Sequence, residues 1–368
     1  MYTRRSLLRT TGVATVATAG LAGCLGGNGD DEDETSGEDE LADEVNVAIY
    51  GGAMGDGISE TILDGFEDEY DITVNAETYP DNWDLIAQVQ AGSTDLDVLI
   101  LDDTAVPSAV SDDLVQPIRE ENVPNLDEIM ADFSPYEQAF DPGDEIHYGP
   151  FQFFGDGLAY NADVLSEPQS WEDVYTDETE GSVIYTSWID RVVGIAASHE
   201  GLSVSELDQD SDAEMEQIWD RVESMNEYVF EWADTGGILQ DSFANEQALA
   251  GMLWYGRVAA LQDDDVAVEY TIPEEGAPMA TSGFSVSADT NRRYTAETFI
   301  DYTLDPDTQY EYSSVMGYAP TAEMDEVPEL VENSPDYQNR DRLNFWNASL
   351  LVENMEEWSL EFQETIGG

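Results

Sequence analysis

Apolar and polar residues alternate regularly along much of this chain, beginning at residue 44. Residues 44–50, EVNVAIY, alternate as a half-buried strand does, and a glycine-rich turn, GGAMGDG, follows them. Ile58, Ile62, Leu63 and Phe66 then lie at the spacing of an amphipathic helix. A strand that leads through glycines into a helix is typical of an α/β fold.

The same succession of strands and helices continues almost to the end of the chain, with no internal repeat. The predicted strands or strand-like segments are 71–79, 96–103, 157–165, 171–175, 182–188 and 266–290. The predicted helices are 82–92, 191–201, 215–233 and 294–316, with a further helix in the tail. The apolar run at 96–103 suits a strand covered on both faces, so we expect a parallel sheet. The length favours two domains or two lobes of one fold.

The charge composition narrows the setting in which such a chain folds. There are 82 acidic residues against 11 basic ones, all of them arginine, and the net charge is -71. Repulsion of this size is screened only by concentrated salt, so we expect the protein to work in brine. Because 41% of the residues are apolar, a sizeable core is still expected. This charge disfavours nucleic acids and anionic membrane surfaces as partners of the body.

The first residues are an export signal rather than part of the fold. Arg4 and Arg5 form a twin arginine, and the small, weakly apolar run 11–23 is too short to span a bilayer. Cys24 follows Leu-Ala-Gly and is the only cysteine, so no intrachain disulfide can form. We interpret Cys24 as the lipidated first residue of a lipoprotein, with a buried structural thiol as the alternative.

Residues 24–43 are rich in glycine and acids and contain little that a core could bury. They are predicted to be a solvated tether between the lipid anchor and the body. With the signal at 1–23, this places the protein on the outer face of the cytoplasmic membrane, exported by the twin-arginine route.

Six segments, taken in their order and spacing, resemble one protein family. They are LDGFEDEYDITV, LIAQVQAGSTDLDVLIL, LVQPIREENVPNL, YGPFQFFGDGLAYNADVL, YTIPEEGAP and AETFIDYTLDPDTQYEYSSVMGYAPT. The chain resembles the spermidine/putrescine type of ABC-transporter solute-binding protein. With its signal and its acidic composition, it is similar to the lipoprotein members of this family in halophilic archaea. The resemblance implies a periplasmic-binding-protein-like (type II) α/β fold, in which two lobes close over a ligand cleft.

The resemblance also implies that each lobe is discontinuous in sequence, with a first crossing near residues 151–157. We expect lobe 1 to comprise residues 44–155 and 255–312, and lobe 2 to comprise residues 156–254 and 313–368.

The function implied by the resemblance is capture of a small organic solute and its delivery to the permease and ATPase subunits of an ABC importer. We expect a monomer with no enzymatic activity, cofactor or metal. One alternative is an exported α/β hydrolase, for which no nucleophile and base are found. Another is an Fe(III)-binding relative that would use Tyr310, Tyr312 and Tyr318, although their spacing does not require it.

The candidate ligand residues depart from the family pattern at its acids. The family's Trp-x-Gly-Asp motif reads Trp254-Tyr255-Gly256-Arg257 here, so a base stands in the position of an acid. Trp188 and Arg191 lie near a second acidic position of the family. Two arginines beside tryptophans suit a carboxylate or phosphate, whereas pairing with nearby acids is the alternative for each.

Further cleft residues are expected at the ends of predicted strands. Tyr50 adjoins the glycine turn, which is either an anion-binding loop or only a tight turn. Ser282 stands where the family has another acid. Asp102 and Asp103 are therefore the remaining candidates to pair with an ammonium group of the ligand. Phe284 is a cleft aromatic or a core residue. Family position therefore favours a polyamine, and the arginines favour an acid or a zwitterion.

Overall fold

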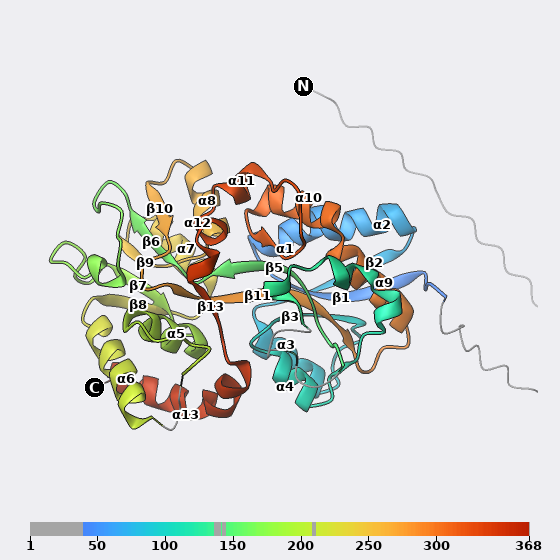
Figure 1. Ribbon diagram of the computed structural model, residues 1–368, viewed down its shortest axis with the longest axis horizontal. Coiled ribbons are helices and arrows are strands. Elements are labelled where there is room, and N and C mark those ends of the chain that lie inside the picture. Colours follow the sequence, from blue (N-terminus) through green and yellow to red (C-terminus); the bar gives the residue numbers. More distant parts are fainter. Residues whose placement is uncertain (1–39, 136–140, 142–144, 208–210, 368) are drawn as a thin grey trace, which may run out of the picture. The chain divides into compact units, whose positions relative to one another are not determined.

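We describe a computed structural model of the chain at residues 40–135, 141, 145–207 and 211–367 (Figure 1). Arg4, Arg5, Cys24 and nearly all of the tether lie outside the described residues. Two sheets flanked by helices make up the body, which confirms the predicted α/β fold. We call the larger sheet with its helices lobe 1 and the smaller sheet with its helices lobe 2.

Lobe 1 contains an eight-stranded mixed sheet built around one long strand. That strand, β11 (Ala277–Ser287), is buried along its whole length and pairs with four others. The strand order is β12 (Ala319–Pro320), β5 (Gly149–Gly155), β11, β3 (Val98–Asp102), β1 (Glu44–Tyr50) and β2 (Thr73–Tyr79), with β4 (Val115–Gln116) and β13 (Leu343–Phe345) also on β11. The expected parallel pairing is present between β1, β2 and β3, where strands alternate with helices.

Lobe 2 contains a five-stranded sheet whose parallel part again comes from alternating strands and helices. The strand order is β10 (Val268–Thr271), β6 (Leu158–Asn161), β9 (Ala250–Met252), β7 (Val183–Thr186) and β8 (Val229–Ala233). Strand β7 runs parallel to β8 and β9, whereas β6 is antiparallel to β9 and β10.

Helices cover the sheets of both lobes (Figure 1). Lobe 1 carries α1 (Ala53–Gly57), which continues through a π-helical segment (Ile58–Leu63) into α2 (Asp64–Tyr70), and also α3 (Asn82–Gln90), α4 (Val106–Ser111), α9 (Arg293–Leu304), α10 (Pro306–Met316) and α11 (Glu329–Glu332). Helix α12 (Pro335–Gln338) follows α11 and contacts β10 of lobe 2. Lobe 2 carries α5 (Ile189–His199), α6 (Asp212–Asn226), α7 (Gly236–Ala244), α8 (Tyr255–Asp263) and α13 (Ala348–Gly367). Short 3-10 helices occur at Glu120–Asn122, Pro124–Glu128, Ala131–Phe133, Trp171–Val174 and Arg340–Arg342.

The chain passes between the lobes three times, and two of the expected lobe boundaries change. The first crossing joins β5 to β6 through Asp156 and Gly157. The second lies at 272–276 and not at residue 255, because α8 packs on β10 and β10 pairs with β6 of lobe 2. Strands β12 and β13 remain with lobe 1, since β12 pairs with β5 and β13 with β11, whereas α12 between them contacts β10 of lobe 2. The third crossing then leads into α13, which packs on α5 and α6.

A buried carboxyl helps to join β3 to β11. Asp103 is fully buried, its backbone N–H donates to the carbonyl of Thr281 at 3.1 Å, and its Oδ1 accepts from the N–H of Thr281 at 3.0 Å. Burial raises the pKa of Asp103 from 3.8 to about 8. Between these values the folded protein keeps a proton that the unfolded chain has released, so this residue's contribution to stability falls as pH rises.

We therefore expect Asp103→Asn to make the free energy of unfolding less dependent on pH between about pH 5 and 8. The asparagine oxygen can still accept from Thr281, and its side chain has no proton to lose. Urea unfolding at a series of pH values, at one fixed salt concentration, measures the slope. Asp84→Asn, at an exposed position of α3, is the control. An Asp103→Asn slope equal to that of the unchanged protein contradicts the assignment.

Candidate ligand-binding site

A cavity of about 480 Å³ lies where strand ends of the two sheets face each other. Tyr50 ends β1 and Asp102 ends β3, while Trp188 and Trp254 follow β7 and β9. The carboxyl ends of strands are the usual place for a ligand in open α/β sheets. Aromatic side chains make up much of the wall, namely Tyr50, Trp83, Phe154, Trp188, Trp254, Tyr318 and Phe362.

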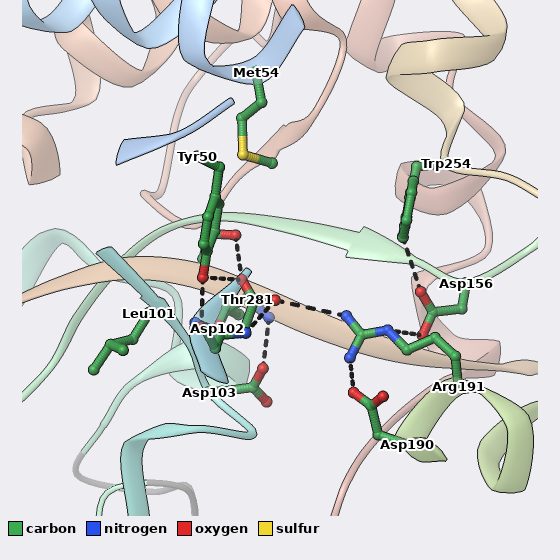
Figure 2. Close-up of polar contacts among 12 residues, drawn as sticks. Tyr50, Met54, Leu101, Asp102, Asp103, Asp156, Asp190, Arg191, Trp254 and Thr281 are labelled. Carbon is green, nitrogen blue, oxygen red and sulfur yellow. Dashed lines mark hydrogen bonds and ion pairs between the residues drawn. The ribbon is translucent and has the colours of Figure 1, made fainter. Parts of the chain in front are cut away.

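On the lobe 1 side, Asp102 is held by a network of neutral donors. Its Oδ1 accepts from the hydroxyl of Ser282 at 2.7 Å and lies 3.4 Å from that of Tyr50. Its Oδ2 accepts from the amide of Asn82 at 3.2 Å, and the same amide's oxygen accepts from the backbone N–H of Asp102 at 2.8 Å. Burial raises the pKa of Asp102, while Arg191 acts to lower it. Its carboxyl is thus fixed in place at the cavity wall (Figure 2).

On the lobe 2 side, Arg191 lies among three carboxylates (Figure 2). Its Nη1 contacts Asp190, its Nε lies 3.2 Å from Asp156 Oδ2, and its Nη2 lies 3.7 Å from Asp102 Oδ2. Burial opposes the charge of this guanidinium, but the carboxylates outweigh burial and raise the pKa of Arg191 further. The guanidinium is therefore not a free fork for a ligand anion, which corrects the expectation for Arg191.

Asp156 ties this cluster to the tryptophans of the cavity. It lies at the first crossing, and its Oδ1 accepts from Nε1 of Trp254 at 2.9 Å. Burial raises the pKa of Asp156 to about 6. Trp254 in turn lies 5.8 Å from Trp188 between ring centres, and Trp188 donates from Nε1 to the carbonyl of Asp234 at 3.1 Å. The indoles are thus held by hydrogen bonds at their polar ends, and both line the cavity.

Arg257 has a different environment from Arg191. Its Nη1 donates to Oε1 of Gln240 at 2.8 Å, and its guanidinium carbon lies 5.7 Å from the centre of the Trp254 ring. No carboxylate among the described residues forms an ion pair with it, although it lies on the cavity wall. Arg257 therefore differs from Arg191 in that its hydrogen-bond partner is a neutral amide and not a carboxylate.

Two of the candidate residues do not line the cavity. Phe284 is fully buried beside Phe151 and Phe299, at 5.2 and 5.3 Å between ring centres, and pairs with Ile100 well inside the sheet. Asp103 follows Asp102 directly and turns to the β11 backbone, because successive strand residues point to opposite faces. The structure brings the remaining candidates together at the cavity: Tyr50, Asp102, Trp188, Arg191, Trp254 and Arg257.

The sequence reasoning missed Asp156, Asp190 and the whole of α13. Met355, Ser359, Phe362 and Gln363 project from α13 into the cavity wall. Their spacing in the sequence predicts that they share one face of a helix. The sequence near them does not show that this face lies against a cleft. Asp156 did carry a signal, since it is an acid between two glycines after an apolar run.

The described residues show neither a membrane-spanning helix nor a metal site. No described helix is long and apolar enough to cross a membrane, and no group of described His, Cys, Asp or Glu residues is arranged to hold a metal. The three tyrosines considered for Fe(III) have different surroundings: Tyr310 is exposed, Tyr312 packs against Phe151 in the core, and Tyr318 lines the cavity.

Gly236 at the start of α7 leaves room for the Arg257 and Trp254 side chains. A Cβ at Gly236 would lie 2.8 Å from the Trp254 ring and 3.0 Å from Nη2 of Arg257. At the next position, Gly237, an added Cβ meets only Oγ1 of Thr235, at 3.8 Å. The two glycines therefore form a matched pair for mutation.

We expect Gly236→Ala to destabilise the protein by about 1–3 kcal/mol, because the Trp254 ring must move. Gly237→Ala should be neutral or stabilising by up to about 1 kcal/mol, since alanine is the better helix former. Urea denaturation followed by tryptophan fluorescence compares the two. Equal stability of both variants would show that Trp254 and Arg257 are not packed against α7.

Comparison with known proteins gives consistent results over most of the chain. A family model described as bacterial extracellular solute-binding protein matches residues 61–339. The putrescine-binding periplasmic protein SpuD of Pseudomonas aeruginosa is 21% identical over 311 residues, which cover 80% of this chain and 84% of that protein.

Two solved structures share the fold. The spermidine/putrescine substrate-binding protein PotD of Streptococcus pneumoniae has a TM-score of 0.73 at 18% identity, covering 88% of this chain and 100% of that one. AgtB of A. tumefaciens R10, solved with agropinic acid, has a TM-score of 0.73 at 18% identity, covering 89% and 100%. These similarities confirm the resemblance to polyamine-type solute-binding proteins and the periplasmic-binding-protein-like fold.

Proposed function

This chain belongs to the family of bacterial extracellular solute-binding proteins, and on that premise we propose that it captures a small zwitterionic solute. Because a solved neighbour is the substrate-binding protein of a spermidine/putrescine ABC transporter, we infer that this chain is likewise the solute-binding component of an ABC importer and not an enzyme. We propose that the solute carries an ammonium group at one end and a carboxylate at the other, and that it is handed to the permease.

The charges of the cavity wall carry this proposal. Four aspartates line the cavity, Asp81, Asp102, Asp190 and Asp234, against the arginines Arg191 and Arg257. Arg191 is already surrounded by carboxylates, so the wall around it favours a cation. Tyr50 and Trp188 also line the cavity, and aromatic rings attract cations.

Arg257 supplies the opposite end of the proposed ligand site. A guanidinium with no acidic partner among the described residues suits a ligand carboxylate, which it can bind with two N–H donors. A solute with two anionic groups would place one of them beside the aspartates, which repel it. A diamine would place one ammonium group beside Arg257, which repels it. The relatives span a comparable range, since SpuD is named for putrescine and AgtB was solved with agropinic acid.

Calorimetry with three solutes of similar length tests the ligand class. We expect 4-aminobutanoate to bind more tightly than putrescine, and succinate to bind least. Arg257→Ala should weaken 4-aminobutanoate binding by about 2–5 kcal/mol, because a buried ligand anion loses its partner, and should leave putrescine binding unchanged or stronger. All titrations should be made at the same salt concentration, in the molar range, so that the screening of charges is the same in each.

Arg340→Ala is the matched control, since Arg340 also lies over an aromatic ring, that of Tyr337, but is exposed and does not line the cavity. Tight putrescine binding that survives Arg257→Ala, with no binding of 4-aminobutanoate, would end the zwitterion proposal and favour a polyamine.

We also propose that the protein is a monomeric lipoprotein on the outer face of the cytoplasmic membrane. The support is the sequence: Arg4 and Arg5, a short apolar run, Cys24 and the acidic tether. Such an anchor would keep the solute-binding body near its permease and ATPase partners.

Replacing Arg4 and Arg5 together by lysine should leave precursor inside the cell, because the twin-arginine signal is lost. Cys24→Ser should release the protein from the membrane fraction. Fractionation with immunoblotting measures both, and Arg9→Lys, in the same signal, is the control for a change of basic residue. Wild-type distribution of both test variants would refute the assignment.

A further inference from the structure

Charged side chains from three different segments meet at one point of the cavity wall. Asp102 comes from the end of β3 in lobe 1, Asp156 from the first crossing, and Asp190 and Arg191 from the first turn of α5 in lobe 2. Arg191 directs one nitrogen to each carboxylate (Figure 2). We call these four residues the charge cluster.

Arg191 cannot leave the charge cluster at small cost. Its side chain is 3% exposed, and those of Asp102, Asp156 and Asp190 are 12%, 1% and 8% exposed. Moving the guanidinium out would leave three poorly solvated carboxylates without a cation, which is strongly unfavourable. The guanidinium is therefore a permanent part of the site, present whether or not a solute is bound.

One carboxylate of the charge cluster keeps capacity for a ligand. Nη2 of Arg191 lies 3.7 Å from Asp102 Oδ2, which is too long for a direct hydrogen bond. The hydrogen bond to this oxygen comes from the Asn82 amide at 3.2 Å. Asp102 and Asp190 line the cavity, whereas Asp156 is bound to Trp254. An ammonium group that enters the cavity therefore finds an acceptor at Asp102.

We infer that Arg191 is a specificity-determining residue, which fills the position of one cation among the three carboxylates and so restricts the site to solutes with a single ammonium group. The inference rests on the proposed solute-binding function and deepens it. A solute with one ammonium group pairs with Asp102, while a second ammonium would have to share carboxylates that Arg191 already contacts. Removing the guanidinium would open that second position.

The test is a gain of diamine binding. Arg191→Met keeps much of the side-chain length and removes the charge, and Arg191→Lys keeps a charge at the position. We expect the affinity for putrescine, measured by calorimetry at fixed molar salt, to rise at least about tenfold in Arg191→Met. Arg191→Lys, which retains a positive charge there, should gain less putrescine affinity than Arg191→Met. A merely structural ion pair would predict weaker binding of every solute.

A folding defect in Arg191→Met is addressed by Arg191→Met combined with Asp190→Asn. This variant removes one charge of each sign and leaves the guanidinium's position empty, so putrescine binding should again rise. Circular dichroism checks that each variant is folded. A folded variant without the guanidinium whose putrescine affinity is unchanged or lower would overturn the inference.

The result separates this inference from the proposed ligand class. Failure of the unchanged protein to bind 4-aminobutanoate counts against the zwitterion. Even then, a gain of putrescine affinity in Arg191→Met would support the role of Arg191. The comparison is between this variant and the unchanged protein with the same diamine, so it does not depend on 4-aminobutanoate. Unchanged putrescine affinity counts against Arg191 even when 4-aminobutanoate binds.

Discussion

The buried guanidinium of Arg191 is the interaction on which the rest of the site depends. A charge removed from water is stable in a protein only when partners replace its solvation, and here three carboxylates do so. Those carboxylates belong to lobe 1, to the first crossing and to lobe 2. The positions of β3, the crossing and α5 are thus linked through one side chain, at the edge of the cavity. Asp156 extends the link to Trp254, and Trp254 extends it to Arg257.

In so acidic a chain, most arginines are expected to have a carboxylate partner. With 82 acidic residues and 11 basic ones, a carboxylate partner is easily found, and several arginines have one. Arg119 and Arg293 share the fully buried Glu297, and Arg221 pairs with Glu200. Arg257 instead lies partly buried on the cavity wall against an indole and an amide. Because most of the described arginines have a carboxylate partner, the position of Arg257 on the cavity wall without one among the described residues points to a role in the site.

The sequence was sufficient for the fold but not for the boundaries of the lobes. Alternating strands and helices predicted the parallel part of each sheet, as in β1, β2 and β3, because neighbouring strands there are close in the chain. The antiparallel pairing of β10 with β6 joins segments about a hundred residues apart, and no local pattern encodes it. For this reason α8 and β10 were expected in lobe 1. A second long-range pairing, of β13 with β11, fixes the end of the segment from which α13 continues to the cavity wall.

The candidate site shows a similar division between what residue types reveal and what geometry decides. Aromatic and charged residues after strand ends were recognisable, and Tyr50, Asp102, Trp188 and Trp254 do line the cavity. Arg191 and Arg257 were expected to play one role, because both follow a tryptophan and begin a helix. Their difference arises from Asp156 and Asp190, which reach Arg191, whereas Gln240 is the polar partner of Arg257. Two arginines thus have opposite surroundings, three carboxylates around Arg191 and a neutral amide beside Arg257, and our proposal of a zwitterionic solute follows from this difference.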